Sequence, residues 1–213
     1  MKKIISFSLV FLLLLGSYFM FSYSNKVVVF SDYLLYPFKE NSEYFNDFDY
    51  SFSHINLTSD LLNEYLDNNA KNLKNNKSIN KLIKRSKKIY LSVGLNDLFT
   101  LVNKNEDSLE VNYSLFLKKI ALLEYNIHEI ITSILAIKKV DIYCFSLYYL
   151  NDEVLDNLIN EFNHEVLDLV NSLNSKFIEV NEIFKISNYS YTYLNQRDLY
   201  KTLEWSNVFF LYK

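Results

Sequence analysis

The sequence predicts an α/β domain with a mainly parallel sheet, because strand-like and helix-like segments alternate along it. Short apolar runs rich in β-branched residues are typical of strands buried on both faces. Longer segments with an apolar stripe at helical spacing separate these runs. Such alternation places helices on both faces of one sheet. We therefore expect a three-layer α/β/α sandwich with five strands, preceded by an apolar N-terminal segment.

Five segments have the composition of strands. Residues 48–55 alternate apolar and polar side chains, which is typical of a half-exposed strand at the edge of a sheet. Right-handed crossovers between parallel strands place this segment beside the first strand. The other four segments are more uniformly apolar and are expected to be parallel and central: 26–31, 88–93, 140–146 and 177–180.

Three segments have helical patterns. Thr58-Ser59-Asp60 supplies N-cap chemistry for a helix that follows it. Apolar residues at helical spacing predict longer helices from about 109 to 137 and from 152 to 174. Between 71 and 88 the chain is rich in lysine, which favours a solvated helix face; attraction to an anionic membrane surface is the alternative.

The composition argues against a nucleic-acid-binding protein, a disulfide-stabilised domain and a metal site of cysteine and histidine. The formal net charge of −3 argues against nucleic acid as the main partner. The one cysteine, Cys144, cannot form an internal disulfide, and the three histidines lack metal-ligand spacing. No metal site built from cysteine and histidine is therefore expected. The length suits one folded domain, which we place at residues 25–213.

Residues 1–24 have the features of a membrane anchor. Lys2 and Lys3 precede an uncharged run from Ile4 to about Tyr23, which is near the length that crosses a bilayer. The lysines favour a cytoplasmic amino terminus and an exported domain on the outer face of the cytoplasmic membrane. A cleaved signal peptide, which would make the protein secreted, is the alternative.

Gly94 marks the candidate functional edge of the sheet. The chain has two glycines, and Gly94 is the one outside the N-terminal run; it lies in Ser92-Val93-Gly94-Leu95-Asn96-Asp97, where a predicted strand ends. Glycine permits a positive φ or a close backbone approach, and ligands bind at the carboxyl ends of strands in open α/β sheets. An ordinary turn is the alternative interpretation.

Polar segments follow the other predicted strands at the same edge. They are Ser31-Asp32-Tyr33, the segment that begins at Asn56, and Ser190-Tyr191-Thr192-Tyr193-Leu194-Asn195. In order and spacing, over residues 26–205, these segments and Gly94-Leu95-Asn96-Asp97 resemble the sequence blocks of the SGNH (GDSL) hydrolases. The resemblance implies a flavodoxin-like sandwich and hydrolysis of acyl, lipid or glycan esters without a cofactor.

The resemblance also assigns positions in this chain. Tyr33 stands where the family has its nucleophilic serine, and Asn56 stands where a glycine donates to the oxyanion. Asn96 matches the oxyanion asparagine, with Gly94 and Asp97 unchanged around it. Ser190 and Tyr193 stand at the acid and base of the Asp-x-x-His block.

The replaced positions predict a loss of chemistry. A tyrosine hydroxyl, with a pKa of about 10 and no histidine beside it, is a poor nucleophile at neutral pH. We therefore expect a degenerate member that binds a small-molecule, acylated or glycan ligand in a pocket of Tyr33, Asn56, Asn96 and Tyr193. An active esterase with a non-standard site, such as Ser31 with His54, is one alternative. A structural or partner-binding envelope protein is another.

Overall fold

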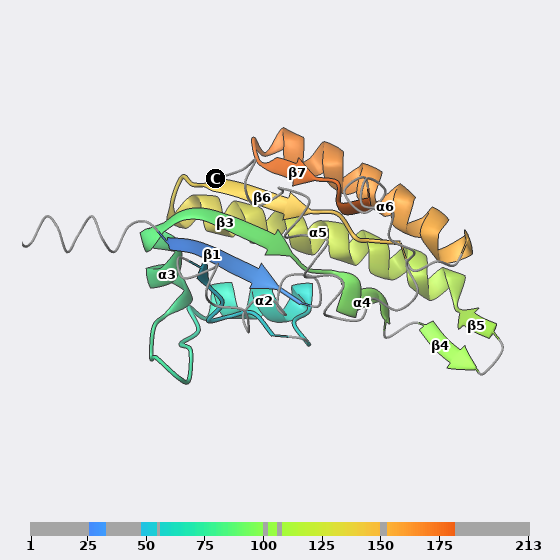
Figure 1. The fold of residues 1–213 in the computed structure, drawn as a ribbon, viewed down its shortest axis with the longest axis horizontal. Helices are drawn as coiled ribbons and strands as arrows, with labels where there is room; N and C mark the ends of the chain where they lie inside the picture. The colour runs from blue at the N-terminus through green and yellow to red at the C-terminus, as the bar shows by residue number, and fades with distance from the viewer. Residues whose placement is uncertain are drawn as a thin grey trace, which may run out of the picture.

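A five-stranded parallel sheet organises the computed structural model (Figure 1). The structure describes residues 26–32, 48–54, 56–99, 102–105, 108–149 and 153–181. The strands are β1 (Lys26–Ser31), β2 (Phe48–Asp49), β3 (Ser86–Ser92), β6 (Asp141–Phe145) and β7 (Lys176–Ile178). They pair in the order β2-β1-β3-β6-β7, and every pairing is parallel. The predicted parallel sheet is confirmed.

The two outer strands differ in part from the prediction. Strand β2 lies beside β1 as expected, but it has two residues rather than eight. It ends early because the Asp49 carboxylate accepts the Ser51 N–H at 3.0 Å and the chain turns there. The prediction that 177–180 is central differs from the structure: among the described strands, β7 lies at the edge and pairs with β6. The connections β3 to β6 and β6 to β7 continue in one direction across the sheet, as crossovers of one hand do, and this places β7 beyond β6.

The helices largely follow the predicted pattern. They are α2 (Ser59–Asp67), α3 (Ile79–Arg85), α4 (Leu95–Phe99), α5 (Tyr113–Ile137) and α6 (Glu153–Ser172). Helix α2 begins at the expected cap, since the Thr58 hydroxyl accepts the Leu61 N–H at 3.2 Å. Helix α3 falls inside the lysine-rich stretch, and its buried residues are Ile79, Leu82 and Ile83.

Helix α5 begins four residues later than predicted, because a hairpin precedes it. Strands β4 (Val102–Asn105) and β5 (Ser108–Val111) form an antiparallel pair. Asn112 then caps α5, and its side-chain oxygen accepts the Leu115 N–H at 3.2 Å. Figure 1 shows the hairpin projecting past the start of α5. The apolar residues near 109 therefore belong to a strand.

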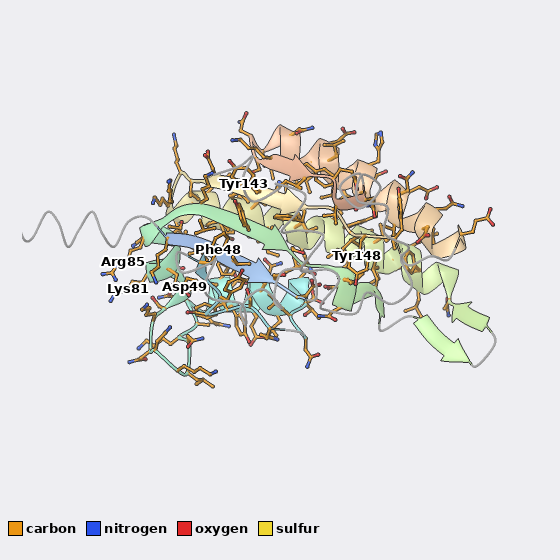
Figure 2. The ribbon with its side chains drawn as sticks, in the orientation of Figure 1. Phe48, Asp49, Lys81, Arg85, Tyr143 and Tyr148 are labelled. Atoms are coloured by element: carbon orange, nitrogen blue, oxygen red, sulfur yellow. The ribbon has the colours of Figure 1, made fainter. Side chains whose placement is uncertain are left out.

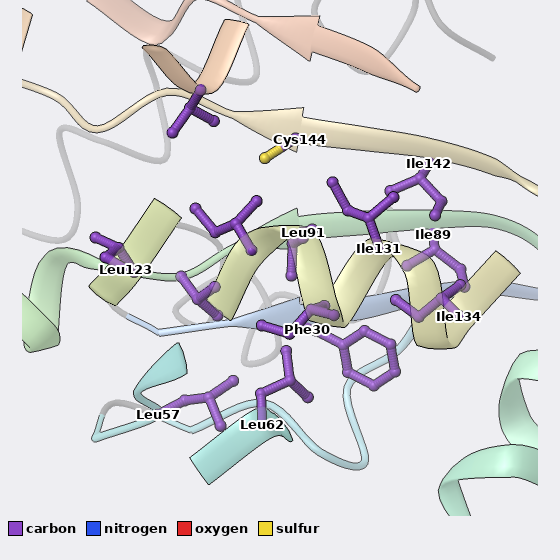
Figure 3. Packing of buried hydrophobic residues seen from close by; sticks show 14 of the residues in the cluster. Phe30, Leu57, Leu62, Ile89, Leu91, Leu123, Ile131, Ile134, Ile142 and Cys144 are labelled. Atoms are coloured by element: carbon purple, nitrogen blue, oxygen red, sulfur yellow. The ribbon is translucent and has the colours of Figure 1, made fainter. Parts of the chain in front are cut away.

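The four longer described helices share one core with one face of the sheet. Alternate strand residues point into this core, among them Phe30, Leu91 and Cys144, where they meet Ile131 and Ile134 of α5 (Figure 3). The opposite face carries Val29, Tyr90, Tyr143 and Phe145, which are also buried. Helices α2, α3, α5 and α6 therefore form one layer. None of the described helices lies on the opposite face, so the second helix layer of the predicted sandwich stays a prediction.

Helix α5 is the central helix of this layer. Among the described residues, its stretch Ser114–Ile137 is the one helix long and apolar enough to cross a bilayer. Here its apolar side contributes to the core through Leu123, Ile127, Ile130, Ile131 and Ile134. The domain core therefore accounts for much of the apolar character of α5. Residues 1–25 lie outside the described part, so the N-terminal anchor stays a prediction.

Gly94 connects β3 to α4 in a conformation that other residues rarely adopt. Its φ is +125°, a value that favours glycine. A Cβ added at Gly94 would also lie 2.8 Å from Leu123 Cδ2 in α5. The glycine therefore allows both the turn at the end of β3 and the close packing of α5 beneath it.

The variant Gly94→Ala tests this double constraint. We expect a loss of about 2–5 kcal/mol in unfolding free energy, from a strained φ and overpacking against Leu123. Urea unfolding followed by circular dichroism measures it. In a Leu123→Ala background the added methyl has room, so the same change should cost less. An equal cost in both backgrounds would assign the whole effect to the backbone, and a cost under about 0.5 kcal/mol would contradict both arguments.

Candidate functional site

The ends of β1 and β3 bring two predicted segments together. Ser31 pairs with Ser92 in the parallel register, and the Asp32 N–H continues the pairing by donating to the Ser92 carbonyl at 3.0 Å. Asp32 therefore lies beside the Gly94 turn. This position is the carboxyl edge of the sheet, where the sequence predicts the site.

The Asp32 side chain caps helix α4. Its carboxylate is 1 % exposed and accepts the N–H groups of Leu95 at 3.1 Å and Asn96 at 3.5 Å. The first amides of a helix have no partner within the helix, and a carboxylate there satisfies them. Asp32 thus fixes the start of α4, and with it the position of Asn96.

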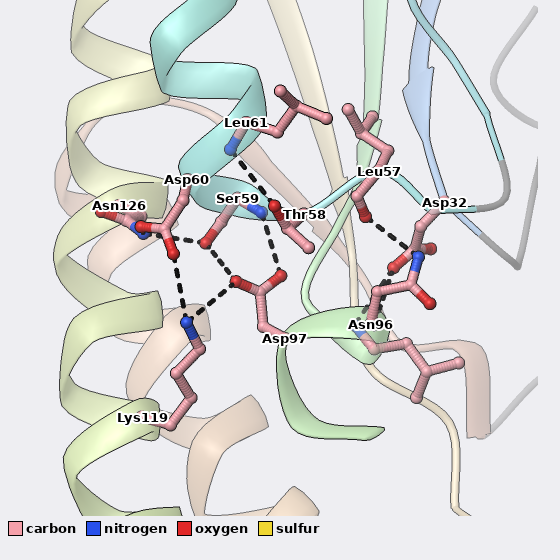
Figure 4. A network of polar contacts seen from close by, with 11 residues as sticks. Asp32, Leu57, Thr58, Ser59, Asp60, Leu61, Asn96, Asp97, Lys119 and Asn126 are labelled. Carbon is pink, nitrogen blue, oxygen red and sulfur yellow. Dashed lines mark hydrogen bonds and ion pairs between the residues drawn. The ribbon is translucent and has the colours of Figure 1, made fainter. Parts of the chain in front are cut away.

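Asn96 joins the third segment to the second. Its side-chain Nδ2 donates to the Leu57 carbonyl at 3.1 Å (Figure 4). Leu57 is buried, whereas the preceding Asn56 is exposed. The structure therefore brings Asp32, Asn56 and Asn96 to one edge of the sheet. The side-chain amide of Asn96 already donates a hydrogen bond to a backbone carbonyl there.

Asp97 points away from Asn96 into a buried polar network (Figure 4). Its carboxylate accepts the Ser59 N–H at 2.9 Å and the Ser59 hydroxyl at 2.7 Å. Asn126 Nδ2 donates to Ser59 Oγ at 2.9 Å and to Asp60 Oδ1 at 2.6 Å. Lys119 Nζ lies 3.1 Å from Asp60 Oδ2 and 3.9 Å from Asp97 Oδ1. Asp97 therefore ties α4 to α2 and α5.

The two carboxylates of this network have opposite pKa shifts. Burial raises the pKa of Asp97 above its ordinary value, although the Ser59 hydrogen bonds and Lys119 oppose the shift. Partial burial also acts to raise the pKa of Asp60, but Asn126 and Lys119 outweigh it and the pKa is lowered. Ser59 was predicted only as a member of the segment that begins at Asn56, and Lys119 and Asn126 were not predicted as part of the site. No local pattern indicates these two, because they are distant in the sequence.

Ser31 lies beneath the surface. Its exposed fraction is 0 %, its N–H donates to Ser53 Oγ at 3.0 Å, and Ser53 Oγ donates to the Val29 carbonyl at 2.5 Å. The His54 ring packs against the Tyr65 ring, with 6.5 Å between centroids. A bulky ester cannot reach a hydroxyl in this position, which disfavours Ser31 as a nucleophile.

The three positions that match the family triad lie outside the described residues. They are Tyr33, Ser190 and Tyr193, so their convergence with Asn56 and Asn96 stays a prediction. Two cavities lined by described residues, of about 340 and 790 Å³, lie at the opposite, amino-terminal end of the strands. In the described part of the chain, no three His, Cys, Asp or Glu side chains gather as a metal site.

Replacing Asp97 tests the polar network and its pH dependence. Asp97→Ala leaves the buried Ser59 N–H without its acceptor, so we expect a loss of about 1–3 kcal/mol in unfolding free energy. Asp97→Asn keeps one acceptor and should cost less. Because the folded-state pKa of Asp97 is raised, its charge opposes folding, and the wild type should lose stability relative to Asp97→Asn as pH rises above about 3.8. Urea unfolding at pH 4 and pH 7 measures the difference; the opposite trend would show a lowered pKa.

Comparison with known proteins rests on structure. No family model matches the sequence, and no curated protein matches it. A variant of Axe2, an acetyl-xylooligosaccharide esterase from Geobacillus stearothermophilus, superposes with a TM-score of 0.58 at 11% identity, covering 87% of this chain and 92% of that one. A Streptococcus pneumoniae protein, provisionally described as a platelet activating factor, gives 0.57 at 15% identity, covering 94% and 97%.

Both neighbours have the SGNH-hydrolase fold. Their coverage extends over most of this chain, and the sheet has the strand order β2-β1-β3-β6-β7 expected for that fold. At these identities the likeness concerns the arrangement of the backbone. The chain therefore has the fold of the SGNH hydrolases.

Proposed function

We propose that this protein is an exported, membrane-anchored member of the SGNH-fold proteins that binds an acylated or glycan ligand and hydrolyses esters weakly or not at all. The proposal rests on one observation: the hydrogen-bonded ends of the strands are retained, whereas the nucleophile and base of the family are replaced. Asp32, Gly94 and Asn96 join the ends of the strands, while tyrosine occupies the positions of the nucleophile and the base at Tyr33 and Tyr193.

The hydrogen bonds at the sheet edge support a preserved binding surface. Asp32 holds the amides of Leu95 and Asn96, and Asn96 holds the Leu57 carbonyl. These contacts fix the three backbone segments relative to one another. A ligand that binds next to these segments contacts a backbone that is already ordered, so less conformational entropy of the protein is lost on binding.

The same residues argue against efficient hydrolysis. A serine nucleophile needs a base to take its proton, and losing one member of such a triad costs several orders of magnitude in rate. An oxyanion would compete with the Leu57 carbonyl for the Asn96 amide. The alternative nucleophile, Ser31, is buried.

The ligand class comes from two observations. Axe2 is an acetyl-xylooligosaccharide esterase, which suggests an acylated glycan for a protein of the same fold. The sequence also places Tyr33, Tyr191 and Tyr193 at the predicted pocket, and tyrosine combines an apolar ring with a polar hydroxyl. Such rings suit the mixed apolar and polar faces of a sugar.

Export follows from the N-terminal segment. The uncharged run from Ile4 to Tyr23 after Lys2 and Lys3 favours an anchor with the domain outside the cytoplasmic membrane. A cleaved leader would give the same domain in secreted form.

A partner-binding envelope protein is the second candidate function. Helix α5 exposes Leu115, Leu122 and Tyr125, with exposed fractions of 48 %, 41 % and 60 %. Their spacing of seven and three residues places them on one side of the helix. Apolar side chains gathered on an exposed helix face favour contact with another protein.

The first test is hydrolysis by the purified full-length chain in detergent. We expect no turnover of an activated short-chain ester near pH 7 above the buffer rate, because serine and histidine are missing from the nucleophile and base positions. Ester cleavage is followed by release of the leaving group. Activity that Ser31→Ala or His54→Ala abolishes would instead reveal a relocated site.

The second test restores the triad. Tyr33→Ser, Ser190→Asp and Tyr193→His together supply nucleophile, acid and base beside Asn96, so we expect measurable ester hydrolysis that no single variant shows. Circular dichroism checks that the triple variant is folded. A matched control places the histidine at the neighbouring position, as Tyr191→His with the other two changes, and should stay inactive. A folded but inactive triple variant would contradict the assigned positions.

A further inference from the structure

The amino-terminal end of the sheet carries a basic cavity. Its volume is about 340 Å³, and its lining includes Lys26, Lys77, Lys81 and Arg85 together with Asp49. Figure 2 shows Lys81 and Arg85 at the end of the molecule where β1 begins. We call the part of the sheet edge formed by these four cations the basic end.

Among the described lining residues, the one carboxylate, that of Asp49, only partly offsets the charge of the cations. Lys77 Nζ lies 3.9 Å from Asp49 Oδ2, so this pair is loose. Lys26, Lys81 and Arg85 are exposed. The described lining of the cavity thus has four cations and one carboxylate, which gives it an excess of positive charge. Arginine and lysine together suit a phosphate, since the guanidinium donates in a fork and the ammonium adds a point charge.

The basic end extends across the start of the sheet. The second cavity, of about 790 Å³, is lined by Lys87, Lys138 and Lys139 with Asp141. The described lining of this cavity thus also has more cations than carboxylates. The positive charge of the two cavities is local, because the whole chain has a net charge of −3.

The loop between α2 and α3 adds an exposed apolar residue on the same side of the fold. Leu73 is fully exposed and lies between Lys71 and Lys74. The loop is closed by the antiparallel bridge of Lys71 with Ser78, and the Asn75 amide donates to Ser51 Oγ at 3.0 Å. A leucine held outside the fold between lysines suits a membrane interface, where apolar groups enter and ammonium groups meet phosphates.

The chain connection fixes which end faces the membrane. Two residues, Ser24 and Asn25, separate the end of the apolar run at Tyr23 from Lys26 at the start of β1. Even fully extended, this connection spans about 10 Å. A membrane anchor at residues 1–24 would therefore hold the basic end at the membrane surface.

We propose that the basic end docks on the anionic outer surface of the membrane. The cavity of Lys26, Lys77, Lys81 and Arg85 takes lipid phosphates, and Leu73 enters the interface. This inference rests on the anchor of the proposed function. Lipid is favoured over an acidic protein because the anchor brings the basic end to the bilayer without a further binding step.

The test measures the environment of Leu73 in the full-length chain reconstituted in lipid discs. A fluorophore is attached through Leu73→Cys. A control label is attached through Leu115→Cys, a half-exposed position near the start of α5 and away from the basic end. The native Cys144 does not compete, because burial raises its pKa to about 12. We expect the label at 73 to be protected from a soluble quencher in discs with phosphatidylglycerol but not in phosphatidylcholine discs. The label at 115 should stay accessible in both.

Charge variants identify the residues responsible. Each cation near an anionic surface contributes about fivefold, so Lys81→Gln with Arg85→Gln should lower the ratio of docked to undocked protein about 25-fold. The control is Lys118→Gln, which changes an exposed lysine near the start of α5, away from the basic end. It should leave the ratio of docked to undocked protein unchanged. Equal effects of the double variant and the control would overturn the assignment to the basic end.

Two outcomes separate this inference from the anchor itself. Alkaline extraction of membranes tests the anchor, because an integral protein stays in the pellet. A chain that stays in the pellet while the label at 73 is unprotected in anionic discs would overturn the docking alone. A cleaved, soluble chain would overturn the anchor, and sedimentation with phosphatidylglycerol vesicles would then test the basic end alone. Protection in native membranes but not in anionic lipid discs would assign the surface to a protein partner and overturn the lipid proposal.

Discussion

The buried carboxylate of Asp32 is the contact on which the candidate site depends. It ends β1 and holds the first two amides of α4, so it sets where that short helix begins. Asn96 is positioned by this contact and in turn holds the Leu57 carbonyl. Three segments that are distant in the sequence therefore share one chain of hydrogen bonds. Removing the Asp32 carboxylate would leave the Leu95 and Asn96 amides without this acceptor and would loosen the position of Asn96.

The core supports this arrangement from below. Gly94 lets Leu123 approach the turn after β3, and Asp97 ties the next turn of chain to Ser59 at the start of α2. The edge of the sheet is thus held by packing on one side and by buried polar contacts on the other. Asp32, Asn96 and Asp97 all have structural partners, but Asn96 is the one of these three motif side chains that is partly exposed, so a ligand could reach it.

Local chemistry explains what the sequence could predict. The apolar strands, the Thr58 cap and the Gly94 turn depend on residues within a few positions, and the structure has all three. The hairpin of β4 and β5 was missed because apolar residues near 109 also fit a helical stripe. Helix α3 was expected only as a lysine-rich face, since its three buried residues are interspersed with lysines. Ser59 lies 38 residues from Asp97 in the sequence and Lys119 lies nearer, and no local pattern indicates either contact.

The length and direction of β1 have a consequence for the kind of ligand the site can meet. Six residues of strand span about 20 Å, and they run from the basic end to Asp32. If the basic end docks on the bilayer as proposed above and β1 stands upright on it, Asn96 would lie about two nanometres from the lipid phosphates. Acyl chains inside the bilayer would then be out of reach of the candidate site. An acylated glycan that extends beyond the membrane would fit that height better.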